Sequence, residues 1–121
     1  METQVKKKVL YVDDEYPNRI TFQITYRNDV DIILADSADD ALEILEEEKD
    51  IEVVITDLRM PGKSGLDLIR EAKVSHPSVR FCLLTGFEVT SEIKEALDSK
   101  LLEQYFRKPF ERSQILDFVK G

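Results

Sequence analysis

The chain has 121 residues, 42% of them hydrophobic and 35% charged, and its formal net charge is −8. This length suits one ordinary domain, and the apolar content argues against a disordered chain. The negative charge argues against direct binding of nucleic acid, because a phosphate backbone needs a basic surface. There is no apolar N-terminal leader and no apolar run near the roughly 20 residues of a membrane span, and the single cysteine cannot form an internal disulfide. These features predict a cytoplasmic location without a membrane partner.

Short apolar runs alternate with longer amphipathic segments along the whole chain. The short runs predict strands and the amphipathic segments predict helices. In chain order we expect a strand at 9–12, a helix starting at Pro17, a strand at 30–34, a helix at 38–48, a strand at 53–55 that runs into Asp57, a helix from Leu66 to the His76-Pro77 pair, a strand at 79–84, a helix at 91–102, a short strand at 103–106 and a helix at 113–119. Ser37 is the expected N-cap of the second helix.

Five strands that alternate with five helices predict an α/β fold. Near-continuous apolar strands joined by helices favour a parallel sheet that is covered on both faces. Right-handed crossovers then give a single-domain, doubly wound (βα)5 sheet of five parallel strands over residues 1–121. In such folds ligands bind beyond the carboxyl ends of the strands.

Polar side chains with related chemistry follow four of the expected strands. Asp13 and Asp14 follow the first strand, Asp57 the third, Thr85 the fourth and Lys108 the fifth. Because the carboxyl ends of parallel strands share one edge, we expect these side chains in one crevice. Three carboxylates repel one another unless a cation neutralises them, and oxygen ligands suit Mg²⁺. With a lysine alongside, the set favours phosphoryl transfer to a carboxylate.

Four motifs carry these residues. They are Val9-Leu10-Tyr11-Val12-Asp13-Asp14-Glu15, then Asp57-Leu58-Arg59-Met60-Pro61-Gly62 with Gly65, then Leu83-Leu84-Thr85-Gly86, and then Tyr105-Phe106-Arg107-Lys108-Pro109-Phe110. Each motif alone is weak, but the four in this order and spacing are specific. Together they resemble the response-regulator receiver domains of bacterial two-component signalling, over essentially the whole chain. The resemblance implies a flavodoxin-like fold similar to that of chemotaxis regulators.

The resemblance implies a phosphorylation-dependent signalling switch, whose only catalysis is its own phosphoryl transfer and autodephosphorylation. Asp57 would accept the phosphoryl group from the phosphohistidine of a sensor histidine kinase or phosphotransfer protein. Asp14 and Asp57 would bind Mg²⁺ through their carboxylates, Asp13 would bind it through water, and Arg59 would bind it through its backbone carbonyl.

The resemblance also assigns roles around the phosphoryl group. Thr85 and Lys108 would contact its oxygens, and Lys108 would contact Asp57 before phosphorylation. The Lys108-Pro109 bond would be cis, as in the family. The family leaves the position of Phe87 variable, and we expect this bulky ring to shield the acyl phosphate from water and slow autodephosphorylation.

Tyr105 matches the family's switch aromatic. It would turn inward when Thr85 moves toward the phosphoryl group, and so change the surface formed by the segments expected at 91–102, 103–106 and 113–119. A homodimer through that surface is compatible with the resemblance. Neither the cognate kinase nor the output follows from the sequence.

Simpler interpretations stand beside these. The Asp13-Asp14 pair would also suit a helix N-terminal cap, and Tyr105 would also suit plain packing against the sheet. A phosphatase of the haloacid-dehalogenase kind would need an acid two residues after Asp57, where Arg59 stands. A pseudo-receiver, a binding module that is never phosphorylated, would lack an acidic or lysine position, and none is lost here.

Overall fold

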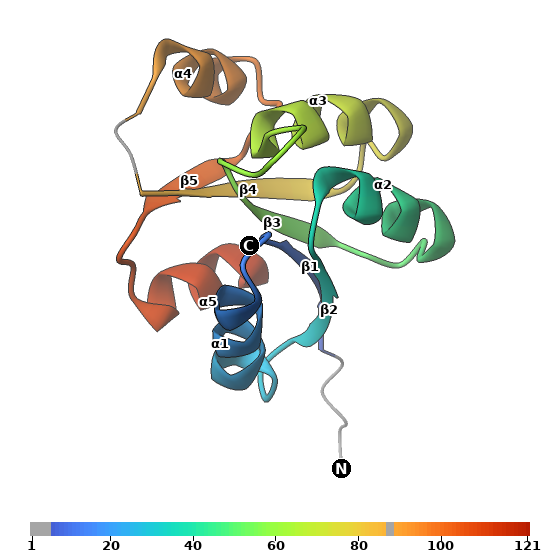
Figure 1. Ribbon diagram of the computed structural model, residues 1–121, viewed down its shortest axis with the longest axis vertical. Coiled ribbons are helices and arrows are strands. Elements are labelled where there is room, and N and C mark those ends of the chain that lie inside the picture. Colours follow the sequence, from blue (N-terminus) through green and yellow to red (C-terminus); the bar gives the residue numbers. More distant parts are fainter. Residues whose placement is uncertain (1–5, 87–88) are drawn as a thin grey trace.

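The computed structural model describes residues 6–86 and 89–121. Strands and helices alternate along this part of the chain (Figure 1): β1 (Lys8–Val12), α1 (Tyr16–Tyr26), β2 (Asp31–Ala35), α2 (Ala38–Glu47), β3 (Val53–Asp57), α3 (Gly65–Ser75), β4 (Arg80–Thr85), α4 (Ser91–Asp98), β5 (Gln104–Arg107) and α5 (Arg112–Lys120). Within these described ranges, no helix has both the length and the apolarity that crossing a bilayer requires.

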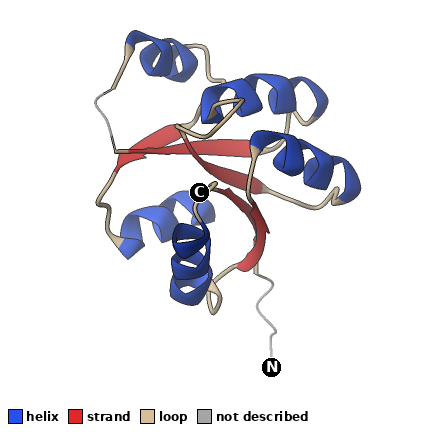
Figure 2. Ribbon diagram, viewed as in Figure 1, coloured by secondary structure: helices blue, strands red, loops and turns tan. Residues whose placement is uncertain are grey.

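The five strands form one parallel sheet in the order β2-β1-β3-β4-β5. Helices α1 and α5 cover one face, and α2, α3 and α4 cover the other, so that the sheet is the middle layer (Figures 1 and 2). This arrangement confirms the predicted doubly wound α/β fold. The strand order changes direction at β1, which places the ligand-binding edge beyond the carboxyl ends of β1 and β3.

Two apolar clusters hold these layers together. Successive strand residues point to opposite faces, so Leu10 and Leu83 pack toward α2, α3 and α4, whereas Val9 and Leu84 pack toward α1 and α5. All four side chains are fully buried. A sheet covered on both faces explains why its strands are nearly continuous apolar runs.

The predicted boundaries agree with the structure to within two residues, except at the helix expected over 91–102. Helix α4 ends four residues earlier, because Lys100 has a positive φ of 63° that stops the helix. The N–H of Leu102 donates to the Ala96 carbonyl at 3.0 Å, which closes the turn. Leu102 is buried in the core. Its apolarity therefore reflects loop packing and not a continued helix.

Helix α3 begins directly against the end of β3. The N–H of Gly65 donates to the Leu58 carbonyl at 2.8 Å. A β-carbon at Gly65 would overlap the carbonyl oxygen of Asp57 and lie 2.9 Å from the Leu83 side chain. Because the obstructing atom belongs to the backbone, it cannot rotate away, and only glycine fits this contact.

We expect Gly65→Ala to lower the free energy of unfolding by about 1–3 kcal/mol, because α3 must move away from Asp57. The matched control is Gly86→Ala, since a β-carbon at Gly86 would meet nothing within 4 Å. Urea unfolding followed by circular dichroism measures both. Equal stability of the two variants would contradict this account of the α3 contact.

Candidate functional site

The sheet brings the predicted acidic residues together at one edge. Asp13 directly follows β1 and Asp57 ends β3, and these two strands are paired neighbours. One carboxylate oxygen from each of Asp13, Asp14 and Asp57 lies within 4.8 Å of the others. Asp13 is buried, Asp57 is partly buried and Asp14 is exposed. We call these three residues the acidic cluster.

Lys108 reaches the acidic cluster from the end of β5. Its Nζ lies 3.4 Å from Asp57 Oδ1 and 4.0 Å from Asp13 Oδ2. Its backbone N–H donates to the Thr85 carbonyl at 2.8 Å, which fixes the segment after β5 to the end of β4. The Lys108-Pro109 peptide bond is cis, as predicted.

Asp57 is partly buried, and its side chain is 15% exposed. Burial raises its pKa, and the charge of Asp13 raises it too. The Lys108 ammonium and the Leu58 N–H, which donates to Asp57 Oδ1 at 3.0 Å, lower the pKa, but the net shift is upward. Asp57 therefore sits in an environment that disfavours an unneutralised negative charge.

Asp13 has no exposed surface, and three neutral donors satisfy its carboxylate. The backbone N–H of Glu15 donates to Oδ1 at 2.9 Å. The Tyr11 hydroxyl donates to Oδ2 at 2.9 Å, and the Asn18 side-chain amide donates to the same oxygen at 3.1 Å. Burial and the charge of Asp13 raise the pKa of Tyr11, so its hydroxyl stays protonated and donates.

The Glu15 contact is a turn bond that precedes α1 and is not the helix cap that the Asp13-Asp14 pair would also suit, because Glu15 is the N-cap residue of α1 and no side chain caps this helix. Tyr11 and Asn18 were not among the predicted site residues. A signal for Tyr11 was available, because residues two apart on a strand point to the same face. From the sequence pattern, Tyr11 is instead interpreted as one more apolar residue of the first strand.

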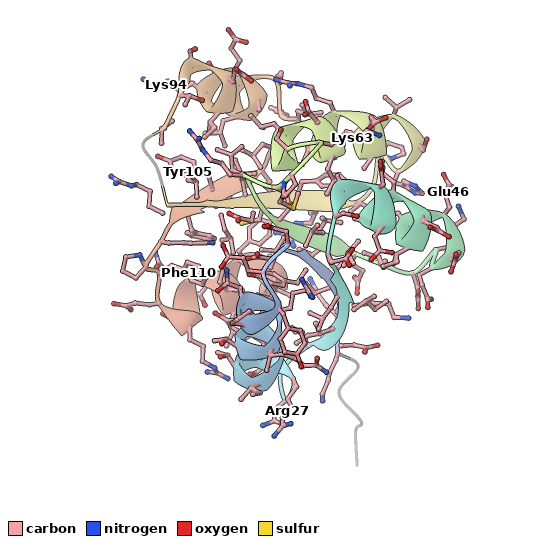
Figure 3. All side chains as sticks on the ribbon, viewed as in Figure 1. Arg27, Glu46, Lys63, Lys94, Tyr105 and Phe110 are labelled. Carbon is pink, nitrogen blue, oxygen red and sulfur yellow. The ribbon has the colours of Figure 1, made fainter. Side chains whose placement is uncertain are left out.

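The structure places the other predicted positions as follows. Thr85 is fully buried at the end of β4, and Arg59 is exposed in the segment after β3. Tyr105 is half-buried on β5 and packs against the apolar cluster between the sheet and helices α2, α3 and α4 (Figure 3). Phe87 lies outside the described residues. The roles given to these residues stay predictions.

The donor chemistry of the acidic cluster fits a hard divalent cation. Its three carboxylates lie close together, and the Lys108 ammonium approaches two of them, so that negative groups outnumber the positive one among these four side chains. Carboxylate oxygens, backbone carbonyls and water are the ligands that Mg²⁺ uses. The residues present are therefore able to hold a metal ion of this class.

The raised pKa of Asp57 predicts a pH-dependent effect of Asp57→Asn on stability. Because the pKa in the folded state lies above the ordinary 3.8, folding opposes ionisation, and stability is lost as pH rises from that value through the folded pKa. The variant escapes this loss. We therefore expect Asp57→Asn to melt at a higher temperature than wild type at pH 7 with chelator present, and the difference to shrink below about pH 4.

Thermal unfolding followed by circular dichroism across this pH range is the measurement. Asp117→Asn, which removes an exposed carboxylate on α5, controls for a general change in net charge. An Asp57→Asn variant that is less stable than wild type at pH 7 would contradict the assigned environment.

The chain is similar to known proteins that contain response regulator receiver domains. The family model described as response regulator receiver domain matches residues 9–120. The chain is 26% identical to the hydrogenase transcriptional regulatory protein HoxA of Bradyrhizobium diazoefficiens over 96% of its own length, but it spans only 24% of that relative.

Two further relatives match over nearly their whole length. Sporulation initiation phosphotransferase F of Bacillus subtilis is 28% identical, with 96% of this chain and 93% of the relative covered. The crystal structure of a response regulator receiver protein from Pseudomonas putida is 30% identical, covers 98% of both chains and has a TM-score of 0.82. The chain therefore belongs to the response regulator receiver domain family.

Proposed function

We propose that this chain is a phosphorylation-dependent signalling switch, with residues 1–121 forming one receiver domain and Asp57 as its phosphoacceptor. The observation that carries the proposal is the convergence of the acidic cluster with Lys108, whose Nζ lies 3.4 Å from Asp57 Oδ1. Membership of the receiver family supports it. The phosphodonor would be the phosphohistidine of a sensor histidine kinase or phosphotransfer protein, encountered in the cytoplasm.

In the transfer step a carboxylate oxygen of Asp57 attacks phosphorus, the phosphorus–nitrogen bond of the phosphohistidine breaks, and the imidazole leaves with the bonding electron pair. The Lys108 ammonium and the Thr85 hydroxyl would bind phosphoryl oxygens and hold the group in line.

Mg²⁺ would be held by Asp13, Asp14 and Asp57, together with the backbone carbonyl of Arg59. When bound, it supplies positive charge that offsets the charge of the phosphoryl oxygens. Asp13 and Asp14 would contribute by keeping the cation beside Asp57. The chain would thus catalyse its own phosphorylation and dephosphorylation and no reaction on another molecule.

Phosphorylation would change the output surface by changing local charge. The ammonium of Lys108, now 3.4 Å from Asp57 Oδ1, would exchange a carboxylate for a phosphoryl partner. Thr85 would move toward the same group, and the half-buried Tyr105 would turn inward. The surface of α4, β5 and α5 would then differ between the two states and bind an effector or a second copy of the chain.

The test is intact-mass analysis after incubation with Mg²⁺ and acetyl phosphate. We expect one added phosphoryl group on wild type, none on Asp57→Asn, and none on wild type when a chelator replaces Mg²⁺. Asp117→Asn serves as the matched control, because it makes the same chemical change on the exposed side of α5. We expect it to be phosphorylated like wild type.

An adduct on Asp57→Asn would place the acceptor on another residue and contradict the assignment. A wild-type chain that takes up no phosphoryl group from acetyl phosphate or from a phosphorylated kinase would favour the pseudo-receiver. Continuous release of inorganic phosphate from unrelated phosphate esters would favour the phosphatase, although the exposed Arg59 cannot act as its general acid.

A further inference from the structure

We infer that Tyr11 is a positioning residue of this site. Its hydroxyl donates a hydrogen bond to Asp13 Oδ2 and so keeps Lys108 paired with Asp57. The inference rests on the proposed function, since it concerns the same cation and phosphoryl group. Tyr11 lies on β1, is 4% exposed, and donates to Asp13 Oδ2 at 2.9 Å. No role for it follows from the phosphoryl-transfer step itself.

The hydroxyl is fixed by packing that lies away from the acidic cluster. The Tyr11 ring stacks on Phe22 of α1, with centroids 4.0 Å apart and an angle of 8° between the planes. Phe22 in turn contacts Tyr26, one turn along α1, at a centroid separation of 4.6 Å. These three rings, which we call the aromatic stack, hold the Tyr11 side chain between β1 and α1. The hydroxyl therefore has a fixed place beside Asp13.

The distances around Lys108 show what this hydroxyl changes. Two carboxylates, Asp13 buried and Asp57 partly buried, compete for the Lys108 ammonium, which lies 4.0 Å from Asp13 Oδ2 but 3.4 Å from Asp57 Oδ1. Asp13 Oδ2 already accepts hydrogen bonds from Tyr11 and Asn18. Asp57 Oδ1 accepts from one neutral donor, the Leu58 N–H at 3.0 Å. A carboxylate oxygen that already has two neutral donors attracts an ammonium less strongly than an oxygen that has one. The Lys108 ammonium therefore pairs more closely with Asp57 than with Asp13.

The neutrality of the donor matters for a cation site. Tyr11 satisfies the buried oxygen of Asp13 without adding positive charge to the acidic cluster. If the hydroxyl were removed, Lys108 would move toward Asp13 to supply the missing donor. Its positive charge would then oppose a divalent cation at Asp13 and would no longer lie beside Asp57, where the phosphoryl group is received.

The experiment measures Mg²⁺ affinity by isothermal titration calorimetry in four proteins: wild type, Tyr11→Phe, Lys108→Met and the double variant. Tyr11→Phe removes only the hydroxyl and leaves the aromatic stack in place. We expect it to weaken Mg²⁺ binding roughly threefold to tenfold, the range for one lost hydrogen bond. In the Lys108→Met background the same change should not weaken binding, because the competing ammonium is gone.

Tyr26→Phe is the matched control, since it removes a hydroxyl from the other end of the same aromatic stack. We expect wild-type Mg²⁺ affinity from it. Asn18→Ala is the second test variant, because it removes the other side-chain donor to Asp13 Oδ2. It should weaken Mg²⁺ binding in the same direction as Tyr11→Phe, and it alters a partly exposed residue outside the stack.

The possible outcomes distinguish failure of this inference from failure of the proposed function. A wild-type protein that binds no Mg²⁺ contradicts both. A wild-type protein that binds Mg²⁺ with the same affinity as Tyr11→Phe and Asn18→Ala contradicts the inference alone. A weakening that persists in the Lys108→Met background also overturns it, because the hydroxyl would then act on Asp13 without Lys108. Weakening only where Lys108 is present supports it.

Discussion

Repulsion within the acidic cluster is the constraint on which the rest of the structure depends. Carboxylate oxygens of Asp13, Asp14 and Asp57 lie within 4.8 Å of one another, and burial adds to the cost by raising the pKa of Asp57. Like charges this close repel one another, and in an unfolded chain they would move apart. Here Asp13 and Asp57 extend from two adjacent strands that are packed on both faces, so they cannot move apart. The same arrangement that raises the pKa of Asp57 gathers carboxylate oxygens that are able to hold a metal ion.

Both helical layers contribute to this placement. On the α1 side, the aromatic stack positions Tyr11 and through it Asp13. On the α3 side, Gly65 lets the helix approach the backbone of Asp57 more closely than any other residue would allow. The far end of the sheet contributes through Lys108, whose backbone is bonded to Thr85. Lys108 therefore links the side chain of Asp57 to the ends of β4 and β5, which lead to α4 and α5.

Much of the fold was predictable because its strands and helices differ in apolar pattern, and a sheet buried on both faces needs continuous apolar runs. The position of the candidate site followed from topology, since parallel strands place their carboxyl ends together. The early end of α4 did not follow, because a positive φ at Lys100 has no apolar signature. Nor did the partnership of Tyr11 with Asp13, because an aromatic residue in a strand indicates core packing as readily as a hydrogen bond to a site.

The central claim, that the carboxyl ends of β1 and β3 form one cation site, is tested most directly by titrating Mn²⁺ into ¹⁵N-labelled protein and following paramagnetic broadening by NMR. The account predicts that resonances of residues next to Asp13 and Asp57 broaden first, and that excess Mg²⁺ restores them. With a net charge of −8 the chain has other acidic surfaces, including residues 46–50, which lie near the amino end of β1, where Glu48 pairs with Lys8. Broadening that begins there, or spreads evenly over the acidic surface, would contradict the account.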